Sequence, residues 1–322
     1  MEKKYIFGID AGGTKVAYGL FDLDGKLLDR FQHPTDIDAN GPVFCDKVIA
    51  TVNEILAKHC ANLDEVKGIG ICMPSYIEFE KGYVHMTSAM VNIREFAMRD
   101  YLQERLGVPV VLDNDSNVAA LAELRQGSGR GCTNMVYVAV STGIGSGIII
   151  NGDLFRGSHG WAGESGHMID TVDGGIMCGC GNRGCFMSQV SGRNMPKRLA
   201  IRLLEGNESV LQEEEELNGE ALLRAYNAGD AVAIAEVDHM AKHLAVCVYN
   251  IYQLLNIDVF VFGGGLTSFG DALFGRMRAY FDLQQFHTKS ARSPLRKRET
   301  CSSFIPKVHA VPSEKGRPAA VS

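Results

Sequence analysis

Residues 5–21 read YIFGIDAGGTKVAYGLF, and residues 135–150 read MVYVAVSTGIGSGIII. In each stretch an apolar run typical of a β-strand is followed by a glycine-rich turn and then by a second apolar run. The two halves of the chain therefore begin with the same pattern. An internal repeat of this kind predicts two units of similar plan that face each other, each contributing one glycine turn to a cleft.

The predicted elements in the rest of the chain alternate between strand and helix. Asp24-Gly25 predicts a hairpin into a third strand at residues 26–31. The pattern then predicts helices at residues 42–58, 96–106, 117–126 and 230–256, and strands at 67–72, 110–112 and 258–262. This order predicts an α/β fold.

Length and charge narrow the class of protein. A chain of 322 residues is long enough for two domains, and its net charge of -6 argues against a nucleic-acid-binding face. We see no apolar run long enough for a signal sequence or a membrane span, which favours a cytoplasmic protein. We predict an N-terminal domain at residues 1–115 and a C-terminal domain at 116–281.

The last segment, residues 282–322, differs from the rest. It holds eight Lys or Arg against three Asp or Glu, and Ser and Pro punctuate it without helical periodicity. We interpret it as an atypical basic tail that is disordered, in which a change of reading frame has replaced a terminal helix.

The first glycine turn has the groups needed to hold phosphate. Backbone N–H groups at Gly12 and Gly13 can approach phosphate oxygens, and Thr14 and Lys15 add a hydroxyl and a cation. The Asp10 carboxylate can orient hydrated Mg²⁺. A tight hairpin without ligand is the alternative interpretation, because the spacing matches neither a Walker loop nor a dinucleotide fingerprint.

The second turn, at residues 141–147, repeats this composition with Thr142, Gly143 and Gly145. Two such turns favour a phosphate-binding role over two coincidental hairpins. A later glycine run at residues 263–265 follows the last predicted strand.

Asp115 lies where a strand gives way to a helix, at the predicted cleft. Phosphoryl transfer uses a carboxylate that accepts the proton of the attacking hydroxyl, so Asp115 is the candidate base. The alternative is that Asp115 or Asp113 only caps the helix.

A cluster of thiols and one imidazole predicts a metal site. Three thiolates and one imidazole fill the tetrahedral shell of a structural Zn²⁺. The alternative is a chance grouping of reduced cysteines. The four predicted ligands are His167, Cys178, Cys180 and Cys185.

The motifs DAGGTK, NDSN, STGIGSGI, GESGH, CGCGNRGC and FGGGL, in this order, resemble those of the ROK family over roughly residues 5–280. That family groups bacterial sugar kinases with sugar-responsive repressors. The resemblance implies a duplicated actin-like fold with ATP between the two glycine turns. It also implies that the adenosine end lies near Gly263, Gly264 and Gly265.

The resemblance further implies roles for individual residues. Asp115 removes the proton of the sugar hydroxyl, and Asn114 and Asn92 lie by the sugar. Glu164 and His167 face sugar hydroxyls, so that His167 binds zinc through one nitrogen and faces the substrate with the other.

Two motifs depart from the family pattern. Family kinases usually have Glu two residues after the last zinc cysteine, where this chain has Met187, and their Pro-Gly turn is Pro74-Ser75 here. A thioether cannot replace a charged acceptor, so glucose is a less secure substrate than in a standard member.

We therefore predict an ATP-dependent hexose kinase that uses Mg²⁺ and a structural Zn²⁺. Glucose phosphorylated at its 6-hydroxyl is the default, and an N-acetylated or epimeric hexose competes with it. A sugar-binding or catalytically degenerate ROK protein is the alternative. A ROK repressor needs an N-terminal DNA-binding helical domain, which a first strand at about residue 5 argues against. A homodimer is expected, because dimers are the commonest soluble assembly.

Overall fold

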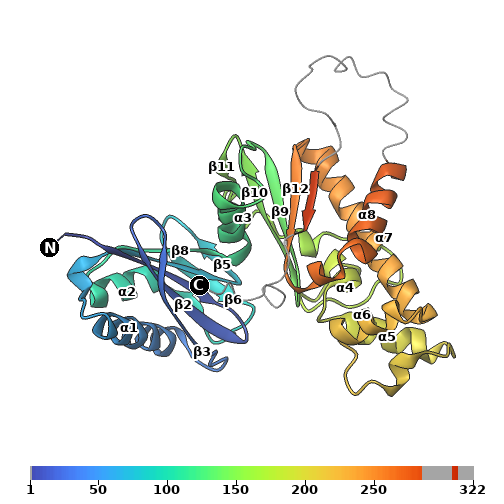
Figure 1. Cartoon of the computed structure of the whole chain (residues 1–322), viewed down its shortest axis with the longest axis horizontal. Coiled ribbons are helices and arrows are strands. Elements are labelled where there is room, and N and C mark those ends of the chain that lie inside the picture. Colours follow the sequence, from blue (N-terminus) through green and yellow to red (C-terminus); the bar gives the residue numbers. More distant parts are fainter. Residues whose placement is uncertain (1, 285–306, 311–322) are drawn as a thin grey trace, which may run out of the picture. The chain divides into compact units, whose positions relative to one another are not determined.

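The computed structural model describes residues 2–284 and 307–310 (Figure 1). These residues form two compact units. Among them, residues 2–119 and 156–162 form the N-terminal unit, and residues 120–155, 163–284 and 307–310 form the C-terminal unit. The chain thus returns to the N-terminal unit for one short segment after it has entered the C-terminal unit.

The N-terminal unit is built on a five-stranded sheet of order β3-β2-β1-β4-β8. The first three strands form an antiparallel meander, and β4 and β8 run parallel to β1. The predicted hairpin at Asp24-Gly25 is confirmed. The strands are β1 (Tyr5–Ala11), β2 (Lys15–Asp22), β3 (Leu27–Pro34), β4 (Val66–Met73) and β8 (Val110–Asn114).

Two helices pack on this sheet, α1 (Gly41–Lys58) and α2 (Met98–Leu106), and η1 (Leu63–Glu65) is a short 3-10 turn. Helix α1 begins where the Asn40 side chain accepts a hydrogen bond from Val43 N, with proline in the first turn. Apolar residues of α1 and of the strands form one buried core. Burial of this apolar face stabilises the helices on the sheet.

A three-stranded antiparallel sheet in this unit was not predicted. It consists of β5 (Ser75–Glu78), β6 (Tyr83–Thr87) and β7 (Arg94–Phe96). The prediction of a helix from residue 96 was wrong at its start, because Phe96 pairs with Val84 in this sheet. These strands are too short to give a clear alternating pattern.

The C-terminal unit repeats the plan of the first sheet, with the order β11-β10-β9-β12-β13. Strands β9, β10 and β11 are antiparallel neighbours, and β12 and β13 run parallel to β9. The internal repeat in the sequence is therefore a repeat in the structure. The strands are β9 (Met135–Val140), β10 (Ile144–Ile150), β11 (Asp153–Leu154), β12 (Val259–Gly263) and β13 (Lys307–Ala310).

Helices cover this second sheet and fill the rest of the unit (Figure 1). The 25-residue helix α7 starts at the Asp230 cap and ends at Asn256 in the left-handed conformation. Its buried face, from Val232 to Ile251, contributes to the core. Helix α3 (Asp115–Gln126) begins in the N-terminal unit and ends in the C-terminal unit. The other helices are η2 (Ser165–His167), α4 (Phe186–Val190), α5 (Met195–Leu204), η3 (Val210–Glu213), α6 (Gly219–Asn227), α7 (Ala231–Leu255), η4 (Gly265–Phe269) and α8 (Asp271–Gln284).

The predicted disordered tail, residues 282–322, lies mostly outside the described residues. Helix α8 extends past the predicted start of this tail, to Gln284, and residues 307–310 form the strand β13 beside β12. In the part of the chain that the structure describes, no helix is long and apolar enough to cross a membrane.

Candidate functional site

The carboxyl ends of the parallel strands of the N-terminal sheet bring several polar groups together. Asp10 on β1 is level with Cys72 on β4, and Cys72 is level with Asp113 on β8. The Cys72 thiol donates to Asp10 Oδ1 at 3.6 Å. Asn114 and Asp115 follow directly, so Asp10, which is predicted to orient hydrated Mg²⁺, and the predicted base belong to one edge of one sheet. Ligands bind at this edge of α/β sheets.

Asp115 is half-buried at the start of α3. Its Oδ1 accepts hydrogen bonds from Ser116 N at 2.8 Å and from Ser116 Oγ at 3.4 Å. Burial raises the pKa of Asp115, and the nearby negative charge of Asp10 adds to this rise. A carboxylate with a raised pKa is a better proton acceptor, which is the property required of a general base.

Asp113 has a structural role that the sequence did not reveal. Its Oδ2 accepts hydrogen bonds from Arg156 Nε at 3.0 Å and from Arg156 Nη2 at 2.8 Å. Its Oδ1 accepts hydrogen bonds from Asn114 N at 2.8 Å and from Asn117 Nδ2 at 2.9 Å. Asp113 therefore fixes the segment that carries Asp115 and joins it to residues 156–162.

The Asn114 side chain forms two hydrogen bonds at the start of α3. Its Oδ1 accepts from Ser116 N at 2.8 Å, and its Nδ2 donates to the Ser75 carbonyl at 3.2 Å. This cap is the reason that α3 begins at Asp115, two residues before the predicted start. Asn92 is exposed, and its amide donates to the Asp38 carbonyl at 2.9 Å.

The first glycine turn is a hairpin between β1 and β2. Gly12 N donates to Lys15 O at 3.0 Å, so the hairpin uses one N–H group that we assigned to phosphate. Thr35 supports the turn by donating to the carbonyls of Gly12 and Thr14. Gly13, Thr14 and Lys15 are exposed at its tip. The hairpin interpretation is thus correct for the backbone, and the phosphate role of the exposed groups stays a prediction.

In the C-terminal unit, the second glycine turn lies beside the glycine run after β12. Strands β9 and β12 are paired, with Gly263 level with Ala139. Gly264 has φ +97°, and a Cβ there would lie 2.6 Å from Val140 O. A Cβ on Gly265 would lie 3.8 Å from Ser141 Oγ. Two predicted nucleotide-binding segments far apart in sequence are therefore neighbours.

The segment that carries Glu164 and His167 packs beside this turn. Gly163 has φ +96° and approaches the Ser146 carbonyl so closely that a Cβ would lie 2.0 Å from it. The Ser146 and Ser165 hydroxyls form a hydrogen bond. Met187 Cε lies 3.0 Å from the Cβ position of Gly166 and 3.9 Å from that of Gly143. The thioether therefore lies between the second glycine turn and the predicted sugar-binding segment.

The four predicted metal ligands come together in the C-terminal unit. The ligand atoms of His167, Cys178, Cys180 and Cys185 all lie within 4.8 Å of one another. Cys180 Sγ and Cys185 Sγ are 3.6 Å apart, and His167 Nδ1 is 3.8 Å from Cys178 Sγ. A tetrahedron with Zn–S bonds of about 2.3 Å has edges of roughly 3.8 Å, so the spacing fits this ion.

The environment of the cluster also suits a cation. Burial raises the pKa of the Cys185 thiol to about 12, and the neighbouring thiols Cys180 and Cys178 contribute to this rise. Burial lowers the pKa of His167, which favours the neutral imidazole that binds metals. Three adjacent thiolates need a positive ion to stabilise them together. Because Nδ1 faces the thiols, Nε2 of His167 stays available to another partner.

The structure divides the predicted sugar-binding residues between the units. Asn92, Asn114 and Asp115 belong to the N-terminal unit, whereas Glu164 and His167 belong to the C-terminal unit.

Comparison with known proteins gives consistent matches. The model of the ROK family matches residues 6–299. A glucokinase of Halalkalibacterium halodurans is 32% identical over 288 residues, which cover 88% of this chain and 86% of that protein. An N-acetyl-D-glucosamine kinase of Photobacterium profundum is 30% identical over 274 residues, covering 82% and 84%. The crystal structure of a ROK family glucokinase from Streptomyces griseus in complex with glucose and AMPPNP is 28% identical, with a TM-score of 0.74 and coverage of 95% and 94%.

Proposed function

Since this chain belongs to the ROK family and has its actin-like fold, we propose that it transfers the γ-phosphoryl group of ATP to a hydroxyl of a hexose. The observation that carries the proposal is the position of Asp115. Its carboxylate lies at the carboxyl edge of the parallel strands, close to Asp10, and burial raises its pKa. The glucokinases among its relatives support the same reaction class.

Asp115 acts as the general base in this proposal. Its Oδ1 is oriented by Ser116 N, which leaves Oδ2 to accept the proton of the sugar hydroxyl. The deprotonated oxygen then attacks the γ-phosphorus and ADP leaves. Because phosphoryl transfer needs little covalent help, the larger contribution of the protein is positioning of both reactants.

The nucleotide is held by the two glycine turns. We assign its phosphates to the exposed tip at Gly13–Lys15 and to the turn at Thr142 and Gly143, and its adenosine end to the glycine run at 263–265. Mg²⁺ is the expected counter-ion of the phosphates, and the exposed Asp10 carboxylate is the group that would orient it through water. The close approach of Gly264 to Val140, the residue before the second glycine turn, supports this assignment.

We assign a structural Zn²⁺ to His167, Cys178, Cys180 and Cys185, whose spacing fits it. With four protein ligands the ion has no open position for a reacting water, so it fixes the loop instead of taking part in the transfer. His167 Nε2 and Glu164 are then positioned for sugar hydroxyls. This assignment predicts that loss of the metal weakens sugar binding as well as stability.

Glucose is our first candidate for the sugar, and its 6-hydroxyl for the acceptor. The names of the relatives include both glucokinase and N-acetyl-D-glucosamine kinase, so an N-acetylated hexose is the second candidate. Met187 is the observation that favours a departure from glucose, because it places an apolar thioether beside Gly166 and Gly143. The same residue supports the alternative of a sugar-binding protein with weakened catalysis. We also propose a homodimer as the assembly.

The test is an ADP-release assay with zinc-loaded protein and MgATP. The sugars are glucose, mannose, allose, fructose, N-acetylglucosamine and N-acetylmannosamine. Asp115→Asn is the test variant, and Asp24→Asn is the matched control, because Asp24 is exposed in a turn and Asn-Gly keeps that turn. We expect turnover on one sugar class, lost in Asp115→Asn and kept in Asp24→Asn. Equal turnover in both variants would exclude Asp115 as the base.

A further inference from the structure

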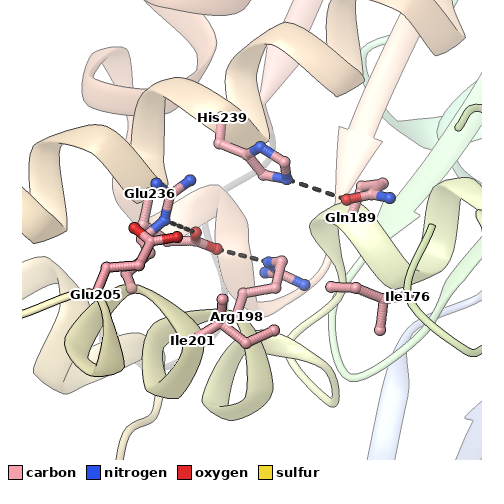
Figure 2. A pocket seen from close by; sticks show the side chains of 8 residues that line it. Ile176, Gln189, Arg198, Ile201, Glu205, Glu236 and His239 are labelled. Carbon is pink, nitrogen blue, oxygen red and sulfur yellow. Dashed lines mark hydrogen bonds and ion pairs between the residues drawn. The ribbon is translucent and has the colours of Figure 1, made fainter. Parts of the chain in front are cut away.

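A pocket in the C-terminal unit lies between the helices α4, α5 and α7 (Figure 2). Its volume is about 200 Å³, several times the volume of about 30 Å³ that a water molecule takes in the liquid. No residue of this pocket belongs to the site proposed above. The lining residues are Ile176, Gln189, Arg198, Ile201, Arg202, Glu205, Glu236 and His239.

One face of α5, together with its C-cap residue Glu205, supplies half of this lining. Arg198, Ile201, Arg202 and Glu205 follow the i, i+3, i+4 and i+7 spacing of neighbours on a helix surface. Both arginines are held in place by one buried acid. Glu236 on α7 is fully buried and accepts from Arg198 Nε at 2.6 Å and from Arg202 Nε at 2.9 Å. The two guanidinium groups therefore keep a fixed orientation.

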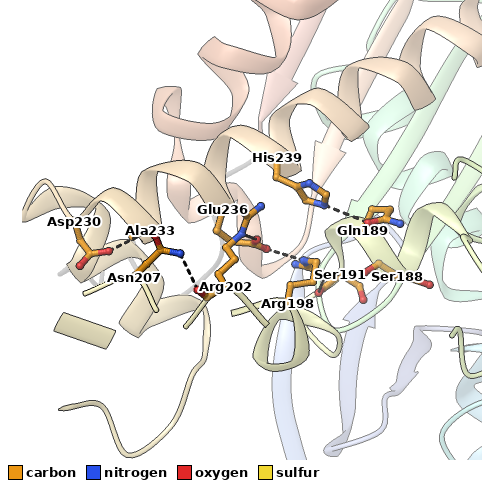
Figure 3. Close-up of polar contacts among 10 residues, drawn as sticks. All are labelled: Ser188, Gln189, Ser191, Arg198, Arg202, Asn207, Asp230, Ala233, Glu236 and His239. Atoms are coloured by element: carbon orange, nitrogen blue, oxygen red, sulfur yellow. Dashed lines mark hydrogen bonds and ion pairs between the residues drawn. The ribbon is translucent and has the colours of Figure 1, made fainter. Parts of the chain in front are cut away.

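These two cations are not fully compensated. Arg198 is 4% exposed, and its Nη1 donates to the carbonyls of Ser188 and Ser191 (Figure 3). Its Nη2 is buried and has no partner among the described residues. A buried donor without an acceptor costs about 1–3 kcal/mol, or more when it is charged. Two guanidinium groups share the single negative charge of Glu236 here. The second acid of the lining, Glu205, is exposed, and solvent screens its charge.

The opposite wall is formed by a neutral imidazole. Burial lowers the pKa of His239 to about 3, and the charges of His243, Arg198 and Arg202 add to this effect. Its Nε2 lies 3.2 Å from Gln189 Oε1, so the ring is oriented by a hydrogen bond (Figure 2). Arg198 and half-buried Arg202 thus carry one more charge than buried Glu236, and the exposed Glu205 brings the whole lining to formal neutrality.

We propose that this pocket binds a small phosphate-bearing anion, with Arg198 Nη2 and the Nη groups of Arg202 as its donors. Because these donors belong to two guanidinium groups, a tetrahedral phosphate with three terminal oxygens can accept from both at once. A carboxylate can also bridge two guanidinium groups, as Glu236 does here, but with two oxygens it offers fewer acceptor positions than a phosphate with three. Ile176 and Ile201 offer apolar contact to the part of the ligand that carries the phosphate.

Ile201 provides a test that leaves the buried ion pairs intact. Ile201 is 50% exposed at the pocket, whereas Leu204, on the same helix, is 86% exposed and is not part of the lining. Ile201→Glu and Leu204→Glu add the same charge to an exposed apolar position of α5. Only the first places that charge beside the proposed ligand. Arg198→Lys is a third variant, which keeps a cation beside Glu236 but removes Nη2.

The measurement is calorimetric titration with inorganic phosphate, glucose 6-phosphate and pyruvate, alongside thermal unfolding of each variant. We expect inorganic phosphate or glucose 6-phosphate to bind to the wild type. We expect Ile201→Glu and Arg198→Lys to weaken this binding by about tenfold or more, and Leu204→Glu by less than about twofold. The proposal would be overturned if neither inorganic phosphate nor glucose 6-phosphate bound, or if pyruvate alone bound. Equal affinity of folded Ile201→Glu and wild type for the phosphate ligand would overturn it as well.

Discussion

Arg156 and Asp113 are joined by two hydrogen bonds, from Nε at 3.0 Å and from Nη2 at 2.8 Å, to the same carboxylate oxygen. The Arg156 guanidinium also stacks on the Phe79 ring, 3.6 Å from its centroid. Asp113 is 5% exposed, so this carboxylate depends on Arg156 for charge compensation. The pair fixes the strand end that precedes Asp115.

Loss of this pair should destabilise the N-terminal unit. We expect Arg156→Gln to lower the free energy of unfolding by about 2 kcal/mol or more, because it leaves a buried carboxylate uncompensated. Arg105→Gln is the matched control. Arg105 also stacks on an aromatic ring, at 3.5 Å from the Tyr101 centroid, but its acid partner Glu104 is exposed. There we expect a change of less than about 1 kcal/mol in urea unfolding. Equal losses in the two variants would contradict the role of Asp113 burial.

Asp115 should cost stability at neutral pH. The pKa of Asp115 is raised in the folded state, so the folded state binds its proton more tightly than the unfolded state does. The stability that results is fully present below the unfolded pKa and is lost as the pH rises through the folded pKa, where the carboxyl group becomes a buried charge. We therefore expect Asp115→Asn to raise the melting temperature at pH 7, with the gain disappearing toward pH 3. Thermal unfolding at several pH values measures this. A lower melting temperature of the variant at pH 7 would show that Asp115 stabilises the fold.

The same raised pKa sets the acid limb of activity. The base must be deprotonated, so kcat/KM should fall with decreasing pH through an apparent pKa above the ordinary aspartate value of 3.8. A pH profile with the preferred sugar tests this, in a range where circular dichroism shows folded protein. An acid limb at or below the ordinary value would contradict the assignment of Asp115 as the base.

The proposed zinc site predicts a definite metal content. We expect about one zinc ion per chain by elemental analysis, and its loss in Cys180→Ser, because thiolates bind zinc and a serine hydroxyl does so poorly. Cys60→Ser, at an exposed cysteine outside the cluster, should keep the metal. Chelation should lower the melting temperature of the wild type and weaken sugar binding. Full zinc content in Cys180→Ser would disprove the four-ligand site.

Met187 should control the choice of sugar. We expect Met187→Glu to change the ratio of kcat/KM between glucose and N-acetylglucosamine by about tenfold or more, because a charged acceptor in the sugar pocket discriminates strongly between hydroxyl patterns. Leu204→Glu adds the same charge on an exposed position of α5 and should leave this ratio unchanged. If both variants keep the wild-type ratio, Met187 does not contact the sugar.

Much of this fold is predictable from local pattern. The two glycine turns, the helices α1 and α7 and the grouping of His167 with three cysteines depend on residues close in sequence. The structure has the turns and helices within a few residues of their predicted positions, and it brings the four side chains together. The repeated sheet order confirms the duplication inferred from residues 5–21 and 135–150.

The features that were missed depend on distant contacts. Arg156 reaches Asp113 across 43 residues of sequence, and no local signal joins them. The strands β5–β7 are short and gain their stability from pairing rather than from propensity. The pocket beside α5 was missed because its two arginines are held together by Glu236 of α7, which is distant from them in the sequence.

The central claim is tested most directly by measuring ADP and hexose phosphate together, in one reaction of the zinc-loaded protein with MgATP and the preferred sugar. We predict equal amounts of both products from the wild type and from Asp24→Asn, and a rate lowered by about a hundredfold or more in folded Asp115→Asn. ADP without sugar phosphate, or no ADP with any of the six sugars, would contradict the assignment of this protein as a hexose kinase.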